Sequence, residues 1–386
     1  MDNLTHSLVG LTAAKAGLER LSPGASALCI LAANAPDVDV AILLFGDRWT
    51  YLHNHRGITH SIVGVAFLAL FLPLLFYGVD RLWARFRNRP ASTKLPGLLL
   101  ASILVTATHP ILDWTNSYGV RPLLPWNAKW YYGDLVYIID PYQWLLLGGV
   151  CFLLSAKTRG GRVVWGVVAA VLTALVIISP RGAGLPSFFV VFWIAAVVGL
   201  IVLFVLGAGR KWGSKLAYNA LWLVLFYWFV LTTFHMDALV TGTEQAEIIV
   251  KQTGETIGRR AAMPTLANPF RWDYVFETER ATYRFNVDTR SDPYTPTTER
   301  IIRYEKPSGP LAEVMEKVST ERPGRIFLDF ARFPVARLAD PNCTTATLVQ
   351  LADLRYTEPG QSRGTFTLNM PVDCPAITGA NTEGGR

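Results

Sequence analysis

Residues 187–207 read SFFVVFWIAAVVGLIVLFVLG and contain no charged side chain. A helix of about 20 apolar residues crosses the ~30 Å hydrocarbon core of a bilayer, so this stretch predicts a transmembrane helix. Other runs predict spans as well, at residues 61–79, 97–112, 142–156, 163–179 and 216–235. Two weaker apolar stretches, 4–18 and 23–35, are too short and too polar to stand alone. We expect these two to form a helical hairpin that packs against the spans.

The composition of the chain changes near residue 235. The whole chain is 51% hydrophobic and only 17% charged, against about 25% charged residues in an average soluble domain, yet residues 236–386 resemble ordinary soluble sequence. Several stretches there are strand-like and separated by turn residues, namely AEIIVKQ, WDYVFET, TYRFNVDT, RIIRYEK, RIFLDFARF and GTFTLNM. One helix is expected at about residues 310–320. We therefore predict a mainly α, polytopic transmembrane helical bundle of about six to eight helices, followed by a C-terminal extramembrane β-rich domain.

Lysine and arginine side chains predict how the bundle is oriented. They concentrate in three loops between spans, at residues 80–96, 157–162 and 208–215. Such loops face the cytoplasm, so both termini and the β-rich domain are expected on the extracytoplasmic side. Residues 1–235 hold 18 Lys and Arg against 9 Asp and Glu, and residues 236–386 hold 18 against 20. The net charge of +7 therefore comes from the membrane half, which indicates membrane lipids and not nucleic acid as partners.

Histidine and aspartate side chains gather in the first 115 residues. Five of the six His lie there, and with nearby Asp they form four short motifs. The motifs are THS with His6, APDVD with Asp37 and Asp39, HNHRGITH with His53, His55 and His60, and HPILD with His109 and Asp113. The loop charges place all four motifs at the extracytoplasmic face of the bundle. Ionisable groups at membrane depth are costly and usually mark a functional site.

The local sequence predicts how these side chains are presented. Pro36 helps to end the second helix, so Asp37 is expected just after that helix. Thr59 is expected to cap the helix that begins near residue 61, which places His60 in its first turn. The His and Asp of HPILD are four residues apart and therefore face the same side of one helix.

The chemistry of these side chains indicates bound divalent metal ions. Neutral imidazole nitrogens and carboxylate oxygens are ligands of Zn²⁺ or, with more carboxylate and water, of Mn²⁺ or Fe. The candidate ligands are too many for one tetrahedral ion and suit two or three ions. Each motif alone has an ordinary alternative: His6 as a cap or interfacial side chain, Asp37 as a helix cap, Pro110 as a kink, HRGITH as a turn contacting lipid phosphates. The convergence of the four motifs at one face favours the metal site.

The order of the motifs resembles a known family. NLTHSLxG, PDxD, HRGxTHS and HxxxD follow one another in bacterial inner-membrane metal-dependent hydrolases of the YdjM type, and the resemblance covers roughly residues 1–140. That family is distantly similar to zinc-dependent phospholipase C and the single-strand nuclease related to it. The resemblance implies metal ligands at His6, Asp37, His55, His60, His109 and Asp113. It also implies that Asp39 is a ligand or a base beside the ligands, that Arg56 binds substrate phosphate, and that the protein lies in a bacterial inner membrane.

These observations predict a membrane-bound metal-dependent hydrolase that acts on phosphoester bonds, in lipids or lipid-linked substrates if the site opens at the bilayer surface. No GxxxxGK[ST] phosphate loop is present, so no nucleotide cofactor is expected. The alternative is a non-enzymatic membrane protein, either a transporter or a partner-binding protein with a structural metal site. The expected domains are residues 1–140 with the site, 141–235 with additional transmembrane helices, and 236–386, the β-rich domain.

The four cysteines divide between two environments. Cys29 and Cys151 lie in apolar stretches, where a free thiol packs as a small apolar side chain. Cys343 and Cys374 lie in the β-rich domain, whose expected extracytoplasmic location favours oxidation. We predict a disulfide between these two, which would contribute ~3 kcal/mol by restricting the unfolded chain. Two unrelated buried thiols are the alternative.

Overall fold

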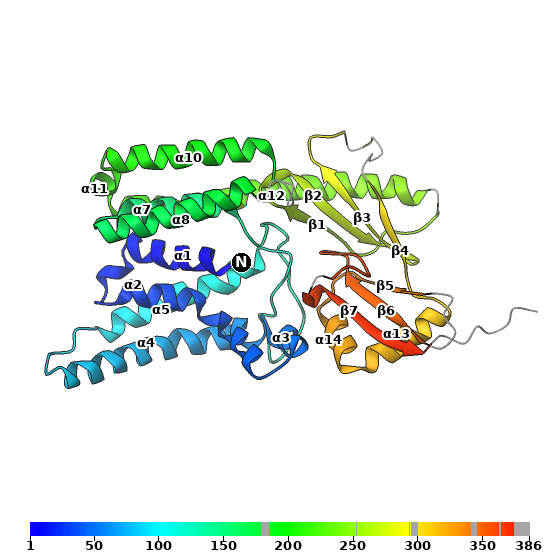
Figure 1. Cartoon of the computed structure of the whole chain (residues 1–386), viewed down its shortest axis with the longest axis horizontal. Coiled ribbons are helices and arrows are strands. Elements are labelled where there is room, and N and C mark those ends of the chain that lie inside the picture. Colours follow the sequence, from blue (N-terminus) through cyan, green and yellow to red (C-terminus); the bar gives the residue numbers. More distant parts are fainter. Residues whose placement is uncertain are drawn as a thin grey trace, which may run out of the picture. The chain divides into compact units, whose positions relative to one another are not determined.

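The computed structural model describes residues 1–178, 185–251, 253–292, 294, 300–340, 346–362 and 364–373. The chain forms two compact units. The first contains Met1–Val40, Arg56–Met236 and Pro264–Arg271, and the second contains Ala41–His55, Asp237–Met263 and Trp272–Arg386. The first unit is a helical bundle and the second holds the β-sheets, which confirms the predicted fold class (Figure 1). The predicted domain divisions after residues 140 and 235 stay predictions.

Apolar helices build the first unit. The longer ones are α1 (Asn3–Ala16), α2 (Ala25–Asn34), α4 (Ile62–Phe86), α5 (Leu95–Trp114), α8 (Arg159–Ile178), α10 (Ser187–Val205) and α12 (Ser214–Lys251). The shorter ones are η1 (Leu18–Arg20), η2 (Ala35–Leu44), η3 (Ile58–His60), α6 (Pro141–Gln143), η4 (Trp144–Gly148), α7 (Gly149–Ser155) and α11 (Ala208–Trp212). Within the described residues, six helical segments are long and apolar enough to cross a membrane. This fits a multi-pass membrane protein.

One predicted apolar segment is longer than the prediction. The α-helix α2 ends at Asn34, next to Pro36, as predicted. Proline is tolerated in the first turn of a helical segment, where its missing N–H would have no partner, and the 3₁₀-helix η2 continues the segment, so Ala25–Leu44 is long enough to be a span. The stretch predicted at 142–156 is the apolar helix Pro141–Ser155, which contains a π-helical turn and is shorter than the six candidate spans.

The three basic loops lie at one end of the first unit. In Figure 1 the connection between α4 and α5, the start of α8, and α11 share this end, and residue 1 lies toward the opposite end. The turn η1 belongs to the basic end as well, because Arg20 Nη2 donates a hydrogen bond of 3.3 Å to Ser214 Oγ. Helix packing and loop charge therefore give the same alternation of helix directions.

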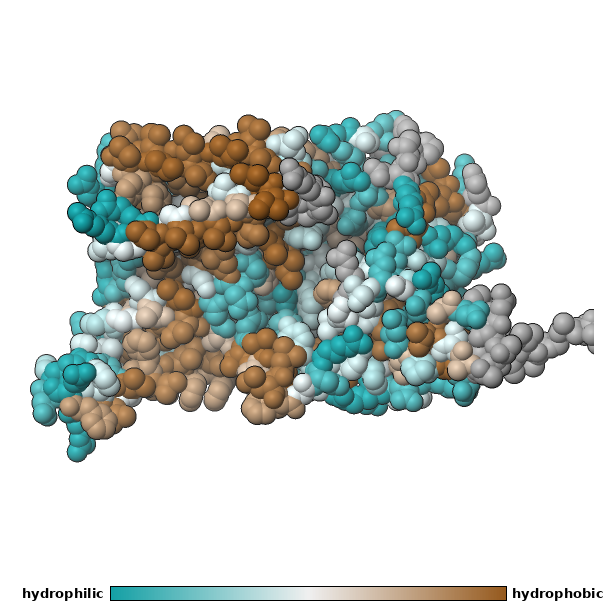
Figure 2. Space-filling model, in the orientation of Figure 1, coloured by the Kyte–Doolittle hydropathy of each residue, from teal (hydrophilic) through white to brown (hydrophobic). Residues whose placement is uncertain are grey.

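Large apolar side chains cover the outside of this unit, and small residues allow close contacts between helices inside it. Figure 2 shows hydrophobic surface over α8 and α10, where Val164 is 61% exposed and Val191 is 69% exposed. Inside, a Cβ atom at Gly10 would lie 2.5 Å from the Cys29 carbonyl oxygen, so α1 and α2 approach each other closely. Small residues at helix contacts are typical of membrane bundles, where lipid leaves no hydrophobic driving force between helices.

Two antiparallel sheets form the second unit. The four-stranded sheet has the order β1 (Arg260–Thr265), β2 (Asn268–Glu277), β3 (Ala281–Asp288) and β4 (Ile302–Glu305). The three-stranded sheet has the order β5 (Pro334–Leu338), β6 (Ala346–Asp353) and β7 (Thr367–Asp373). The helical elements of the unit are α3 (Arg48–Asn54), α13 (Pro310–Thr320), α14 (Arg322–Phe330) and η5 (Gly364–Phe366). The helix expected at 310–320 is confirmed as α13.

Two of the predicted strands are helical. Residues 246–251 of AEIIVKQ lie at the end of α12, a helix of 38 residues, because adding residues to an existing helix avoids the cost of starting a new element. RIFLDF lies in α14, where Ile326, Phe327 and Phe330 are buried. These three positions lie on one face of the helix. The stretch is rich in residues that favour strands, which is why a strand was predicted.

The segment between the APDVD and HRGITH motifs belongs to the second unit. Within Ala41–His55, the Asp47 carboxylate pairs with Arg322 at 3.0 Å, and Arg322 Nη2 donates a hydrogen bond of 2.6 Å to Thr50 Oγ1. This ties α3 to α14. The chain therefore leaves the first unit after Val40 and returns to it at Arg56.

A short segment of the C-terminal half belongs in turn to the first unit. The turn between β1 and β2, within Pro264–Arg271, accepts a 3.1 Å hydrogen bond from the Tyr142 hydroxyl at Ala267 O. The Phe270 ring packs edge-on against Phe234 of α12, with ring centroids 5.2 Å apart. Each unit thus contains a segment whose neighbours in sequence belong to the other unit.

The predicted disulfide cannot be placed in this fold, because Cys343 and Cys374 lie outside the described residues. Cys29 and Cys151 are buried free thiols, as their apolar surroundings predict.

Candidate metal centre

Helix α5 carries two buried candidate ligands, His109 and Asp113. Both face the same side of the helix, 0% and 1% exposed, with His109 Nε2 and Asp113 Oδ2 3.4 Å apart. His109 Nδ1 lies 2.6 Å from the Ala33 carbonyl oxygen. A carbonyl only accepts hydrogen bonds, so Nδ1 carries the proton and Nε2 keeps its lone pair. This is how a metal-binding histidine is normally oriented.

His60 lies in the 3₁₀ turn η3, just before α4. The expected cap at Thr59 is wrong, because Ser61 is the N-cap of α4 and its side chain accepts a hydrogen bond from Gly64 N. The Thr59 hydroxyl instead donates a hydrogen bond of 3.2 Å to Asp39 Oδ2. His60 Nδ1 lies 3.0 Å from the same hydroxyl oxygen and 3.4 Å from Asp39 Oδ2. Because the hydroxyl gives its proton to Asp39, its oxygen accepts from the protonated His60 Nδ1, which leaves Nε2 available as a ligand atom.

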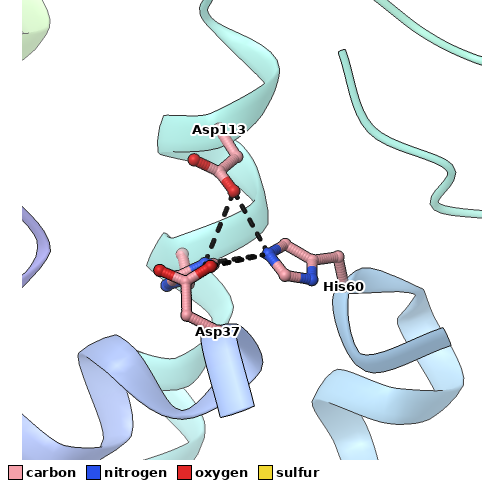
Figure 3. Close-up of side chains that lie close together, drawn as sticks. Asp37, His60 and Asp113 are labelled. Atoms are coloured by element: carbon pink, nitrogen blue, oxygen red, sulfur yellow. Dashed lines mark hydrogen bonds and ion pairs between the residues drawn. The ribbon is translucent and has the colours of Figure 1, made fainter. Parts of the chain in front are cut away.

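Four ligand atoms converge between η2, η3 and α5. They are Asp37 Oδ1, His60 Nε2, His109 Nε2 and Asp113 Oδ2, and all lie within 4.8 Å of one another. Figure 3 shows Asp37, His60 and Asp113 pointing toward one another from three separate elements. The two Nε2 atoms are 3.1 Å apart, and each lies between 3.2 and 3.5 Å from the two carboxylate oxygens. Ligand atoms on a tetrahedral ion with bonds of ~2.0–2.2 Å are about 3.3–3.6 Å apart, so this spacing fits one divalent ion.

The polar atoms of this cluster are poorly satisfied by the protein itself. Two imidazole lone pairs 3.1 Å apart repel each other, and Asp113 Oδ2 accepts no hydrogen bond although it faces both rings. Both ring nitrogens of His6 are also buried without a hydrogen-bond partner. Buried polar groups are normally paired, and a cation among these atoms would satisfy them together. The residues present therefore fit a metal ion.

Arg56 is held against the cluster in a strained conformation. Its backbone has φ 54°, in the left-handed region that non-glycine residues rarely adopt. The buried guanidinium pairs with Asp113 Oδ1 at 3.0 Å and donates 3.0 Å to Asn116 Oδ1. It also lies over the Tyr118 ring, 4.5 Å from the centroid. Asn116 and Tyr118 escaped the sequence analysis, where only the polar run TNSY after HPILDW could have indicated them.

Two further predicted ligands occupy other positions. The His6 ring stacks on His109, with centroids 3.8 Å apart, and His6 Nε2 lies 3.4 Å from Asp113 Oδ1. The α-amino group of Met1 contacts the same carboxylate oxygen. His55 forms the C-cap of α3 and stacks on Tyr51 within the second unit. The ligand roles of His6 and His55, and the phosphate-binding role of Arg56, stay predictions.

One sequence signal for this site was missed. The hexapeptide THSLVG at residues 5–10 recurs as THSIVG at residues 59–64. Each copy places a buried His four positions before a glycine that a neighbouring backbone approaches. A Cβ at Gly10 would lie 2.5 Å from the Cys29 carbonyl oxygen, and a Cβ at Gly64 would lie 1.9 Å from the Ile58 carbonyl oxygen. In each copy, the glycine therefore allows the backbone near the histidine to pack directly against another backbone segment.

Comparisons with known proteins match the N-terminal part of the chain to a family. Residues 1–184 match the family described as YdjM inner membrane protein, which confirms the predicted resemblance over that part of the chain. The chain is similar to the uncharacterized protein YfhP of Bacillus subtilis, 30% identical over 152 residues that cover 37% of this chain and 42% of YfhP. It is also similar to the inner membrane protein YbcI of Escherichia coli, 32% identical over 105 residues that cover 26% of this chain and 53% of YbcI. The matches thus span about half the length of these relatives. No solved structure matches the chain.

Proposed function

We propose that this chain, whose residues 1–184 match the family described as YdjM inner membrane protein, is a membrane-bound metal-dependent hydrolase that cleaves phosphoester bonds. The observation that carries the proposal is the convergence of two imidazole nitrogens and two carboxylate oxygens at the spacing of a metal ion. Zn²⁺ fits this ligand set best, and Mn²⁺ or Fe fit it next. The further His and Asp of the four motifs are the basis for proposing two or three ions.

The residues around the cluster support this chemistry. A bound divalent ion would supply a water of lowered pKa and would stabilise negative charge on a phosphoryl group. Asp39 positions His60 through the Thr59 hydroxyl. The Arg56 Nε is a buried donor without a hydrogen-bond partner, which supports a role in binding a phosphate oxygen. The Asp37 side chain is 13% exposed, whereas those of His60, His109 and Asp113 are at most 1% exposed, so Asp37 is the most accessible member of the ligand group.

A serine nucleophile is a weaker candidate for the reaction. GQSRG at residues 360–364 has the GxSxG spacing. However, Ser362 is exposed in the segment between β6 and η5. The serine motif requires a sharp turn from a strand into a helix, which raises the serine above a sheet.

The side of the membrane follows from the basic loops. Because these loops lie at one end of the first unit and mark the cytoplasmic side, we place the metal site and both termini on the extracytoplasmic side of the inner membrane.

A structural metal site is the second candidate, and one observation favours it. Four protein ligands can fill a tetrahedral ion and leave no position for water. Against this, structural zinc sites are normally rich in cysteine, and all four members of this group are His or Asp. Hydrolysis requires a fifth coordination position or the displacement of Asp37, the most exposed ligand.

A rate comparison tests the proposed function. Purified protein, supplied with Zn²⁺ or Mn²⁺, is assayed against phospholipids, nucleotides and aryl phosphates, beside His109→Ala and the control His53→Ala, an exposed histidine of the second unit. We expect hydrolysis by the wild type and the control and its loss in His109→Ala, by 10²-fold or more when a metal ligand is removed, on the order of the loss for a catalytic group. Equal rates for all three proteins would remove the enzymatic proposal. Stoichiometric metal without hydrolysis of any substrate would favour the structural role.

A further inference from the structure

An apolar groove of about 470 Å³ runs between α4 and α5, and His60 lines one end of it. Its α4 wall includes Val65, Ala66 and Ala69, and its α5 wall includes Ile103 and Ala107. The α4 positions recur at i, i+1 and i+4, and the α5 positions at i and i+4, so one face of each helix lines the groove. The alanines leave the space that larger side chains would fill. The volume lies in the range of small-molecule pockets.

One residue belongs to both the groove and the metal centre. His60 is among the residues that line the groove, and its Nε2 belongs to the group of four ligand atoms. From Val65 to Ala69 the wall rises along α4 by ~6 Å at 1.5 Å per residue, away from His60 and toward the middle of the helix. A molecule in the groove would therefore have one end at the cluster and the other at membrane depth.

The surroundings restrict what can occupy such a groove. Both α4 and α5 are long and apolar enough to be spans, and Leu70 and Ile103 at the groove are 50% and 45% exposed. Within a bilayer an apolar molecule gains nothing by leaving lipid for an apolar wall. The affinity of such a molecule must therefore come from a polar end. The cluster together with Arg56 provides a binding site for an anionic polar end. The occupant is then an amphiphile with a hydrocarbon chain and a phosphate head.

We propose that the groove between α4 and α5 binds the hydrocarbon chain of a lipid substrate and directs its phosphoester to the metal centre from within the bilayer. The cleavage of the phosphoester bond in this proposal rests on the proposed hydrolase function. The groove adds the substrate class, a lipid phosphoester that approaches along α4, and it makes Ala66 and Ala69 determinants of chain binding.

Photolabelling tests chain binding without requiring activity. The probe is hexadecyl phosphate with a diazirine in its chain, added to the detergent-purified full chain with Zn²⁺, and labelled peptides are identified by mass spectrometry. We expect label on the α4 and α5 peptides that contain Ala66 and Ala107. Ala66→Phe should lower that label about tenfold, since an aromatic ring excludes several methylenes. Val63→Phe is the matched control, because Val63 is exposed on the same helix outside the groove.

Label spread evenly over α8 and α10, or unaffected by Ala66→Phe, would overturn the proposal. A cross-linking experiment with Ala66→Cys provides a second test. If two copies of this variant cross-link at position 66 and hexadecyl phosphate does not prevent it, a second copy of the chain covers the groove and the proposal is overturned.

A pair of substrates separates the groove from the proposed function. Methyl and hexadecyl esters of 4-methylumbelliferyl phosphate contain the same scissile bond and differ in the chain. We expect the wild type to prefer the hexadecyl diester, and Ala66→Phe to lower kcat/KM for it by about 10- to 100-fold through misplacement, with the methyl diester unaffected. Hydrolysis of both esters with no selective loss in Ala66→Phe would refute the groove alone. Photolabelling of the groove without hydrolysis of either ester would refute the hydrolase and leave chain binding supported.

Discussion

Each unit of the molecule buries an aspartate beside an arginine, and the two pairs differ in how well they are satisfied. In the second unit Arg355 contacts Asp353 through Nη2 at 2.6 Å and Nε at 2.9 Å, with both side chains 0% exposed. Asp353 also accepts a 3.1 Å hydrogen bond from Arg332 N. In the first unit Arg56 pairs with Asp113 at 3.0 Å, but Asp113 Oδ2 and Arg56 Nε have no hydrogen-bond partner.

This difference separates a structural pair from a binding site. A buried ion pair is stable only when hydrogen bonds satisfy its remaining polar atoms, and Asp353 with Arg355 meets that condition using protein groups alone. The cluster around Asp113 lacks such partners and presents two imidazole lone pairs at 3.1 Å. Protein atoms complete the first arrangement, whereas the second leaves polar atoms that a bound cation could satisfy.

The largest effect on stability is expected from breaking the satisfied pair. Asp353→Ala leaves Arg355 buried without its carboxylate, which costs about 3–5 kcal/mol. We expect the second unit to unfold at lower temperature, seen as earlier loss of near-ultraviolet circular dichroism, with metal content unchanged.

The matching change in the first unit is Asp113→Asn, which keeps the side-chain volume. It should lower metal content and leave the unfolding of the second unit as in the wild type. A loss of metal in Asp353→Ala equal to that in Asp113→Asn, measured before unfolding, would contradict the division between the two pairs.

A smaller effect is expected from the glycine below His60. Gly64→Ala places a Cβ 1.9 Å from the Ile58 carbonyl oxygen, so the turn Ile58–His60 must shift. Overpacking of this kind costs about 1–3 kcal/mol, and here it moves a ligand, so metal should bind more weakly in a titration followed by calorimetry. Gly78→Ala on the same helix is the control, since its Cβ meets no atom within 4 Å. Equal metal affinity in Gly64→Ala and Gly78→Ala would show that the close approach does not position His60.

The smallest change in stability is expected at the Asp47–Arg322 pair, whose side chains are 50% and 51% exposed. Exposed pairs contribute little to stability, so Arg322→Ala should leave the unfolding temperature nearly unchanged. It should nevertheless speed amide hydrogen exchange in α3, because Arg322 ties this helix to α14. Arg290→Ala, which breaks another exposed pair in the same unit, is the control. Unchanged exchange in α3 would show that other contacts hold the segment.

The same pair has a defined pH dependence. Hydrogen bonds from Thr50 and the ion pair with Arg322 hold the pKa of Asp47 below its usual range. A depressed carboxyl pKa stabilises the folded state above the unfolded pKa of ~3.9 and loses that contribution on acidification. The difference in α3 exchange between wild type and Arg322→Ala should therefore be present at neutral pH and disappear in acid.

Local patterns in the sequence identified the elements that depend on local interactions. The spans α4, α5 and α10 follow from uninterrupted apolar runs, and the shared face of His109 and Asp113 follows from their spacing on one helix. The length of Ala25–Leu44 was missed because a 3₁₀-helix continues past Pro36.

Features that depend on distant contacts were not accessible in this way. Arg56 is held by Asn116, 60 residues away, and the membership of Ala41–His55 in the second unit depends on Arg322, 275 residues from Asp47. No pattern within a single element records such partners. The ligand group itself was predictable because membrane topology placed its motifs at one face before any contact was known.

The most direct measurement is the metal content of detergent-purified protein by elemental analysis. The account predicts at least one equivalent of zinc, manganese or iron in the wild type and in His53→Ala, with a marked loss when His60 or Asp113 is replaced by Ala. Stoichiometric metal that survives simultaneous replacement of Asp37, His60, His109 and Asp113 would contradict the assigned centre. A folded wild-type protein that binds none of these ions, even when they are added in excess, would contradict it as well.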